Sequence, residues 1–213
     1  MMQEPEARST RLFSTLAMTT ALLTVGLIVF GAVVRVTDSG LGCGDSWPLC
    51  AGRVLPPLDN LTAWIEWLHR LFAASIGVMG LATLAAGWRL RREQHFAFLA
   101  VGAAAFLFFI QSALGAVVVL LELPPTMVAL HLGTAMLLLA ALLIAAVTSI
   151  YQPDARLQSD PVSLLIYLTT TLSLVIILTG ALVRGSGATL ACTDWPLCNG
   201  DILPVAQGQP ALI

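Results

Sequence analysis

The sequence predicts an all-α integral membrane protein, built as a four-helix bundle unit plus the first helix of a second, parallel-repeated four-helix unit. Of its 213 residues, 58% are hydrophobic and only 10% are charged, whereas a soluble domain carries about 25% charged residues. Five apolar stretches are long enough to cross a bilayer, and one motif recurs about 148 residues further on. This composition excludes a water-soluble enzyme. The net charge of −2, with ten arginines and no lysine, excludes a nucleic-acid partner.

The five predicted helices cover approximately residues 12–34, 64–88, 96–121, 127–151 and 162–183. Each is close to the roughly 20 apolar residues that span a hydrocarbon core, and a segment within lipid must bond its own backbone, which requires a helix. The first stretch exceeds the roughly 7–15 apolar residues of a signal peptide. The expected organisation is an N-terminal segment (1–11), a four-helix unit (12–151), a linker (152–161) and an incomplete second unit (162–213).

The arginines predict the orientation in the membrane. Six of the ten lie in the N-terminal segment and in the loops after the second and fourth spans, and four lie on the other side. Short loops rich in arginine favour the cytoplasm. We therefore expect a multi-pass cell-membrane protein with a cytoplasmic N-terminus and extracytoplasmic cysteine loops.

An internal repeat divides the chain. The segment GAVVR at 31–35 recurs as GALVR at 180–184, and WPLC at 47–50 recurs at 195–198. Both copies start at the outer end of a helix, so each unit contains an even number of spans and the repeat is parallel. With this offset, counterparts of Glu66 and His69 would fall beyond residue 213. The sequence is therefore either a fragment of an eight-helix protein or a truncated relative of one that ends after the fifth helix, and we expect the fragment.

Two histidines are the candidate metal ligands. His69 and His131 lie at matched depths, about 7 Å beyond the predicted starts of two helices that run in the same direction. A pair of imidazoles between helices of a four-helix unit can bind haem iron, since the porphyrin supplies the other four ligands. The alternative is that each histidine forms a structural hydrogen bond between helices. Copper or zinc fits less well because no further protein ligands are evident at that depth.

Glu66 shares a helix face with His69, three residues away. Beside a haem ligand, its carboxylate could act as a general base or stabilise a developing cation; alone, it could simply lie at the membrane interface. Arg35, Arg70 and Arg184 lie at the outer ends of spans. They either extend towards the interface or bind carboxylates such as haem propionates.

The four cysteines form two pairs in equivalent outer loops. Cys43 and Cys50 share the first loop, and Cys192 and Cys198 share the second. Because these loops face the oxidising side, each pair is expected to form a disulfide within its loop. Such a disulfide is either a structural staple or a redox-active pair that passes electrons to or from the site.

Together these motifs resemble the heme A synthase family. The resemblance is carried by GAVVR leading into SGLGCGDSWPLC, by IEWLHR at 65–70, by LHLG at 130–133, and by GALVRGSGATLACTDWPLCNG. It covers essentially the whole chain. Members of the family are eight-helix membrane enzymes that oxidise a ring methyl of heme O to the formyl group of heme A, for use by terminal oxidases.

The resemblance implies roles for individual residues. His69 and His131 would bind the iron of the substrate, heme O, in the N-terminal half, and Glu66 would be the catalytic carboxylate. The disulfide between Cys43 and Cys50 would be linked to activity, with Cys192 and Cys198 as its counterpart. Heme B would occupy the C-terminal half, whose histidine ligands are missing here, so the activity of this chain alone is in doubt. The implied partners are heme O, an electron acceptor, heme O synthase, terminal oxidase assembly factors and a second copy of the chain.

Three other functions remain open on the residues alone. A quinone-linked disulfide-relay oxidoreductase also has four outer cysteines, but it gives no role to the histidines or Glu66. A non-catalytic bis-histidine cytochrome explains the histidines but not Glu66 or the paired cysteine loops. A binding role in oxidase assembly is a third alternative.

Overall fold

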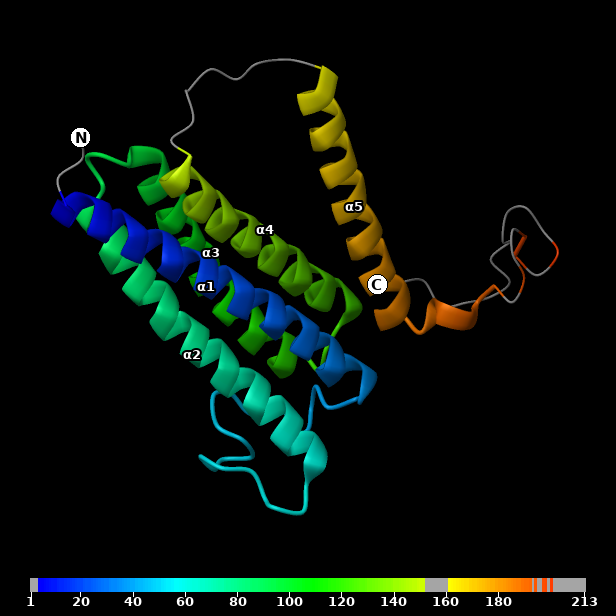
Figure 1. Cartoon of the computed structure of the whole chain (residues 1–213). Helices are drawn as coiled ribbons and strands as arrows, with labels where there is room; N and C mark the ends of the chain where they lie inside the picture. Colours follow the sequence, from blue (N-terminus) through cyan, green and yellow to red (C-terminus); the bar gives the residue numbers. More distant parts are fainter. Residues whose placement is uncertain (1–3, 152–160, 193, 195–196, 199, 201–213) are drawn as a thin grey trace.

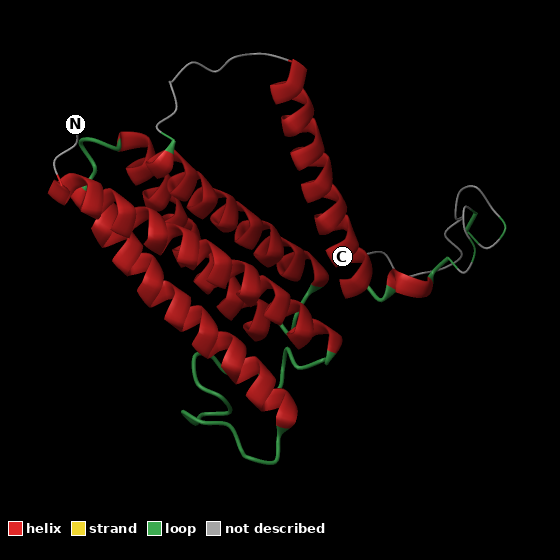
Figure 2. Cartoon of the chain, in the orientation of Figure 1, coloured by secondary structure: helices red, strands yellow, loops and turns green. Residues whose placement is uncertain are grey.

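The computed structural model describes residues 4–151, 161–192, 194, 197–198 and 200. Its helices are α1 (Glu4–Val36), α2 (Leu61–Arg89), α3 (His95–Leu120), α4 (Pro125–Ile150), α5 (Pro161–Gly185) and a short 3-10 helix, η1 (Ala188–Leu190). The described residues contain no strand, apart from one isolated bridge between Cys50 and Arg53 (Figure 2). By length and hydropathy, α1 to α5 can each cross a membrane. The expected all-α membrane fold is confirmed.

Helices α1 to α4 pack side by side as an up-and-down bundle (Figure 1). Helix α1 packs against α2 and α4, and α3 packs against α4 and α2, so α2 and α4 face each other diagonally. Successive helices run in opposite directions, and α2 and α4 therefore run the same way. Helix α5 packs along α4, and none of its residues is buried.

The start of α2 is fixed by local hydrogen bonds. The side chain of Asn60 caps the helix by accepting from the backbone N–H of Ala63 at 3.0 Å, which satisfies one of the free donors of the first turn. The indole of Trp64 donates to the carbonyl of Pro57 at 3.0 Å, and that of Trp67 donates to the carbonyl of Val54 at 2.8 Å. The second half of the 37–60 loop is thereby attached to the first turns of α2.

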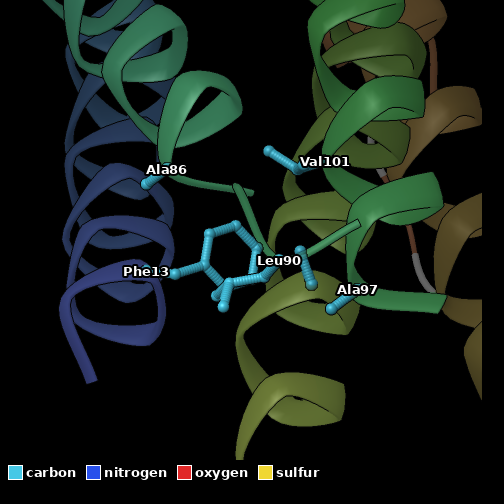
Figure 3. Close-up of a cluster of buried hydrophobic side chains, with 6 residues drawn as sticks. Phe13, Ala86, Leu90, Ala97 and Val101 are labelled. Carbon is cyan, nitrogen blue, oxygen red and sulfur yellow. The ribbon is translucent and has the colours of Figure 1, made fainter. Parts of the chain in front are cut away.

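The two larger clusters of buried side chains lie in the half of the bundle away from the 37–60 loop. There Phe13 of α1 is completely buried against α2 and α3, as Figure 3 shows, in a cluster formed by Phe13, Ala86, Leu90, Ala97, Val101 and Ala145. A second cluster is formed by Ala21, Ala104, Leu138, Ala141 and Leu142. The many alanines let the helices approach closely, as is typical of membrane bundles. The other half, which carries His69 and His131, contributes no residue to these two clusters.

Candidate functional site

His69 lies on α2 with one edge of its ring against α1. A Cβ atom added to Gly31 would lie 3.3 Å from Cε1 of His69, so the glycine leaves room for the ring. The ring of Phe30 lies 5.9 Å from that of His69, centroid to centroid. Nδ1 of His69 is buried and has no hydrogen-bond partner among the described residues. Helix α1 therefore positions this imidazole by shape rather than by hydrogen bonding.

His131 lies on α4 in a matching position against α3. A Cβ atom added to Gly115 would lie 3.3 Å from Cε1 of His131 and 3.9 Å from its Nδ1. Nδ1 is again buried without a partner in the described part of the chain. The difference lies at the other ring nitrogen, because Nε2 of His131 is hydrogen-bonded to the side-chain amide nitrogen of Gln111 at 3.1 Å. Each hairpin, α1–α2 and α3–α4, thus seats one imidazole against a glycine.

The two imidazoles belong to the same region of the bundle. Helices α2 and α4 begin three and two residues earlier than the hydropathy pattern predicts, so His69 and His131 lie about 12 and 9 Å from the helix starts at 1.5 Å per residue. Because the helices run in the same direction, these depths correspond. The arrangement can present two nitrogen ligands from diagonal helices to one guest molecule.

Glu66 connects α2 to the cysteine loop. Its side chain is buried at 3% exposure, and its Oε2 accepts a hydrogen bond from the backbone N–H of Cys43 at 2.8 Å. Its Oε1 forms an ion pair with the guanidinium of Arg70, one turn further along the helix. A buried carboxylate needs such partners to offset its loss of hydration. The carboxylate is therefore held by one charge and one backbone donor.

Arg70 and Ser46 extend this network into the loop. Nη1 of Arg70 donates towards the carbonyls of Ser46, Pro48 and Leu49, at 3.0, 3.3 and 3.2 Å. The hydroxyl of Ser46 donates to the carbonyl of Cys43 at 2.9 Å and accepts from the N–H of Ala51 at 2.8 Å. The segment 43–51 is consequently a folded unit docked on α2.

Both expected disulfides are present. Cys43 pairs with Cys50 and Cys192 pairs with Cys198, which confirms the pairing within each loop. Cys43, Cys50 and Ala63 form a small buried cluster with Trp67 packed against it. The first disulfide therefore lies next to the hydrogen-bond network that holds Glu66.

The other two arginines are placed differently from Arg70. Arg35 lies in the last turn of α1 and is half-buried, while Arg184 lies in the last turn of α5 and is exposed. Within the described part of the chain, neither side chain forms an ion pair. Arg70, in contrast, uses both terminal nitrogens on Glu66 and the loop.

Three features of this region were not assigned a site role from the sequence. These are Gln111 and Gly115 of α3 and Ser46 of the 37–60 loop. An amide in an otherwise apolar span is itself a signal, since polar groups are costly there. The role of Ser46 depends on the folded loop and has no pattern in the sequence.

The fold and this site define a multi-pass membrane protein in which a diagonal pair of imidazoles lies in the half of the bundle next to a disulfide-bonded loop. The sequence profile of the cytochrome oxidase assembly protein family matches residues 14–62 and 59–211. The chain belongs to this family.

Several curated proteins that this chain resembles are named heme A synthase. The protein of Symbiobacterium thermophilum is 36% identical over 191 residues, covering 85% of this chain and 62% of the relative. The protein of Geobacillus kaustophilus is 37% identical over 197 residues, covering 89% and 62%. That of Halalkalibacterium halodurans is 33% identical over 210 residues, covering 94% and 68%. The resemblance seen in the sequence motifs is confirmed, and the chain spans a little under two thirds of the length of the first two.

Proposed function

We propose that this chain forms the substrate-binding unit of a heme A synthase, which oxidises a ring methyl of heme O to a formyl group for terminal oxidase assembly. The observation that carries the proposal is the matched pair of imidazoles, His69 and His131, on diagonal helices that run in the same direction. The heme A synthase relatives support the reaction. The whole enzyme is longer than this chain in those relatives, so the proposal concerns the unit that binds heme O.

The residues fit a haem between α2 and α4. Gly31 and Gly115 leave the space in which the two rings lie, with Cε1 of each ring against its glycine. A bound haem supplies redox-active iron and a conjugated ring that can delocalise positive charge. Two histidines complete the coordination of a porphyrin iron, so no further protein ligand is needed.

Glu66 is the proposed catalytic carboxylate. Oxidation of a methyl to a formyl group consumes one water and releases four electrons and four protons, and the electrons pass to an acceptor outside the described residues. A negative charge close to the reacting carbon favours loss of its electrons and protons. The ion pair with Arg70 orients the carboxylate of Glu66.

The arginines divide between two proposed tasks. Arg35 and Arg184, at the outer ends of α1 and α5, are proposed to bind haem propionates, because a guanidinium matches a carboxylate in charge and shape. For Arg70 this role would fall to Nε, since its terminal nitrogens already bond to Glu66 and the loop.

The remaining assignments follow the same proposal. The N-terminus faces the cytoplasm of a cell-membrane protein, and the Cys43–Cys50 and Cys192–Cys198 loops face outwards. Residues 12–151 form the first four-helix unit, and the segment from residue 162 begins a second unit that would hold heme B. Heme O synthase, oxidase assembly factors and a second copy of the chain are the proposed protein partners.

Haem extraction with mass analysis tests this function. The chain is produced together with a heme O synthase, purified, and its pigment identified. Heme O or heme A in the purified protein supports the proposal. Heme B alone would indicate a bis-histidine cytochrome, and the absence of haem would favour a disulfide relay. The His69→Ala and His131→Ala variants should each lower the haem content.

A further inference from the structure

Gln111 is a polar side chain in the apolar helix α3. Its amide nitrogen lies 3.1 Å from Nε2 of His131, and its carbonyl oxygen is buried without a hydrogen-bond partner among the described residues. An unbonded buried carbonyl is unfavourable. The amide therefore makes one specific contact, with the ring of His131, and nothing else in the described structure holds its oxygen.

The two imidazoles differ in this one respect. When Gly31 and Gly115 are taken as equivalent positions, Gln111 lies four residues before one glycine and Leu27 lies four residues before the other. Residues four apart share a helix face, so the amide on α3 corresponds to a hydrocarbon side chain on α1. Accordingly, His69 has no hydrogen bond to either ring nitrogen within the described residues, whereas His131 has one.

The bonded nitrogen is also the one that a metal would need. The Cε1–Nδ1 edge of His131 faces the backbone of α3 at Gly115, 3.3 and 3.9 Å from the position of an added Cβ. Since Nδ1 lies against α3, Nε2 is the nitrogen through which His131 would bind a metal. Whichever way the amide of Gln111 is turned, it occupies the lone pair or the proton of Nε2, and neither arrangement can coexist with iron at that nitrogen.

We propose that Gln111 acts as a latch on His131, because its amide blocks Nε2 until it turns away. An incoming haem therefore binds His69 first and His131 second. This rests on the proposed binding of haem between the two histidines. The single hydrogen bond makes release of His131 a separate step, and the unbonded carbonyl leaves the amide free to turn away. Gln111 is thus a positioning residue that orders the loading of the site.

Rapid mixing of the haem-free chain with ferric haem B tests the order of binding. In the unchanged protein, a high-spin phase whose rate depends on haem concentration should precede a low-spin phase whose rate does not. In Gln111→Leu the second phase should accelerate by roughly 3- to 10-fold, the factor that one net hydrogen bond is worth, and the first phase should keep its rate. Ser112→Ala is the matched control, because Ser112 is exposed and bonds only to its own helix at Phe108.

Histidine variants identify which ring acts in each phase. His131→Ala should complete the first phase and stop there, and His69→Ala should lose the fast first phase. An unchanged second phase in both Gln111→Leu and Gln111→Ala, each with the helical content of the parent by circular dichroism, would overturn the latch. A fast phase that survives in His69→Ala but not in His131→Ala would overturn the order. If the parent chain forms no low-spin species, the haem site itself is refuted.

Discussion

The backbone N–H of Cys43 donates a hydrogen bond to the carboxylate of Glu66 across 2.8 Å. Cys43 belongs to the disulfide of the 37–60 loop, and Glu66 lies one turn before His69 on α2. The proposed catalytic carboxylate and the disulfide are therefore neighbours in one network. A movement of the loop backbone at Cys43 therefore alters a hydrogen bond of Glu66. A movement of the Glu66 side chain likewise alters a hydrogen bond of the loop.

Two substitutions of Glu66 should separate its charge from its role as a loop anchor. Glu66→Gln retains an oxygen that can accept from Cys43, so we expect the loop to stay docked and haem to bind, while formation of heme A stops. Both variants lose the ion pair with Arg70, and Glu66→Ala in addition leaves the backbone N–H of Cys43 without its acceptor, so Glu66→Ala should be the less stable of the two by about 1–3 kcal/mol. Haem analysis and thermal unfolding measure the two effects. Normal heme A production by Glu66→Gln in the full-length enzyme would refute the catalytic role.

Arg70 should control access to the disulfide. Arg70→Lys keeps the positive charge but loses the planar fork that spans Glu66 and the loop carbonyls, so the loop should loosen in part. Arg70→Met should loosen it fully. The rate at which dithiothreitol reduces Cys43–Cys50, followed by thiol labelling and mass analysis, should rise in the order parent, Lys, Met. Equal rates in all three proteins would show that Arg70 does not hold the loop.

Gly42 is required for the close approach of the loop to α2. A Cβ atom at this position would overlap the backbone carbonyl of Thr62, and backbone atoms cannot move aside cheaply. Gly42→Ala should therefore cost about 1–3 kcal/mol and speed the reduction of Cys43–Cys50. Gly102→Ala is the control, because nothing lies within 4 Å of its added Cβ. A Gly42→Ala protein as stable as the control would contradict this packing.

Substitution of the glycines that contact the imidazoles should change the spectrum of a bound haem. Alanine at Gly31 or Gly115 would come within 3.3 Å of Cε1 of His69 or His131, so the ring must move by a few tenths of an ångström. We expect each variant to retain haem and to shift the low-spin electron paramagnetic resonance signals. Gly80→Ala, with nothing within 4 Å of its added Cβ, should leave the spectrum unchanged. If the spectra of Gly31→Ala and Gly115→Ala are identical to that of the parent, the glycines do not position the imidazoles that bind the haem.

The sequence predicts the parts of this structure that depend on hydropathy and spacing. The five helices follow from apolar length, and the corresponding depths of His69 and His131 follow from helical rise. The disulfides follow from paired cysteines in equivalent loops. These features are local, and they need no knowledge of which helices touch.

Contacts between distant segments could not be predicted in this way. The bond from Cys43 to Glu66 requires the loop to fold back over α2, which depends on the turn geometry of residues 37–60. The contact of Gln111 with His131 requires the register of α3 against α4, and hydropathy does not determine register. The predicted starts of α2 and α4 are three and two residues too late, because Asn60 and Pro125 begin these helices before the apolar pattern does. The predicted start of α1 is eight residues too late, because its first two turns, EPEARSTR, are polar and carry no hydropathy signal.

The low-temperature electron paramagnetic resonance spectrum of the chain loaded with ferric haem tests the central claim most directly. If the imidazoles of His69 and His131 bind one iron, the parent should give a low-spin bis-imidazole signal. Either single alanine variant should convert it to a high-spin signal. The same low-spin signal in the His69→Ala/His131→Ala double variant would show that other residues bind the iron, and the account would be wrong.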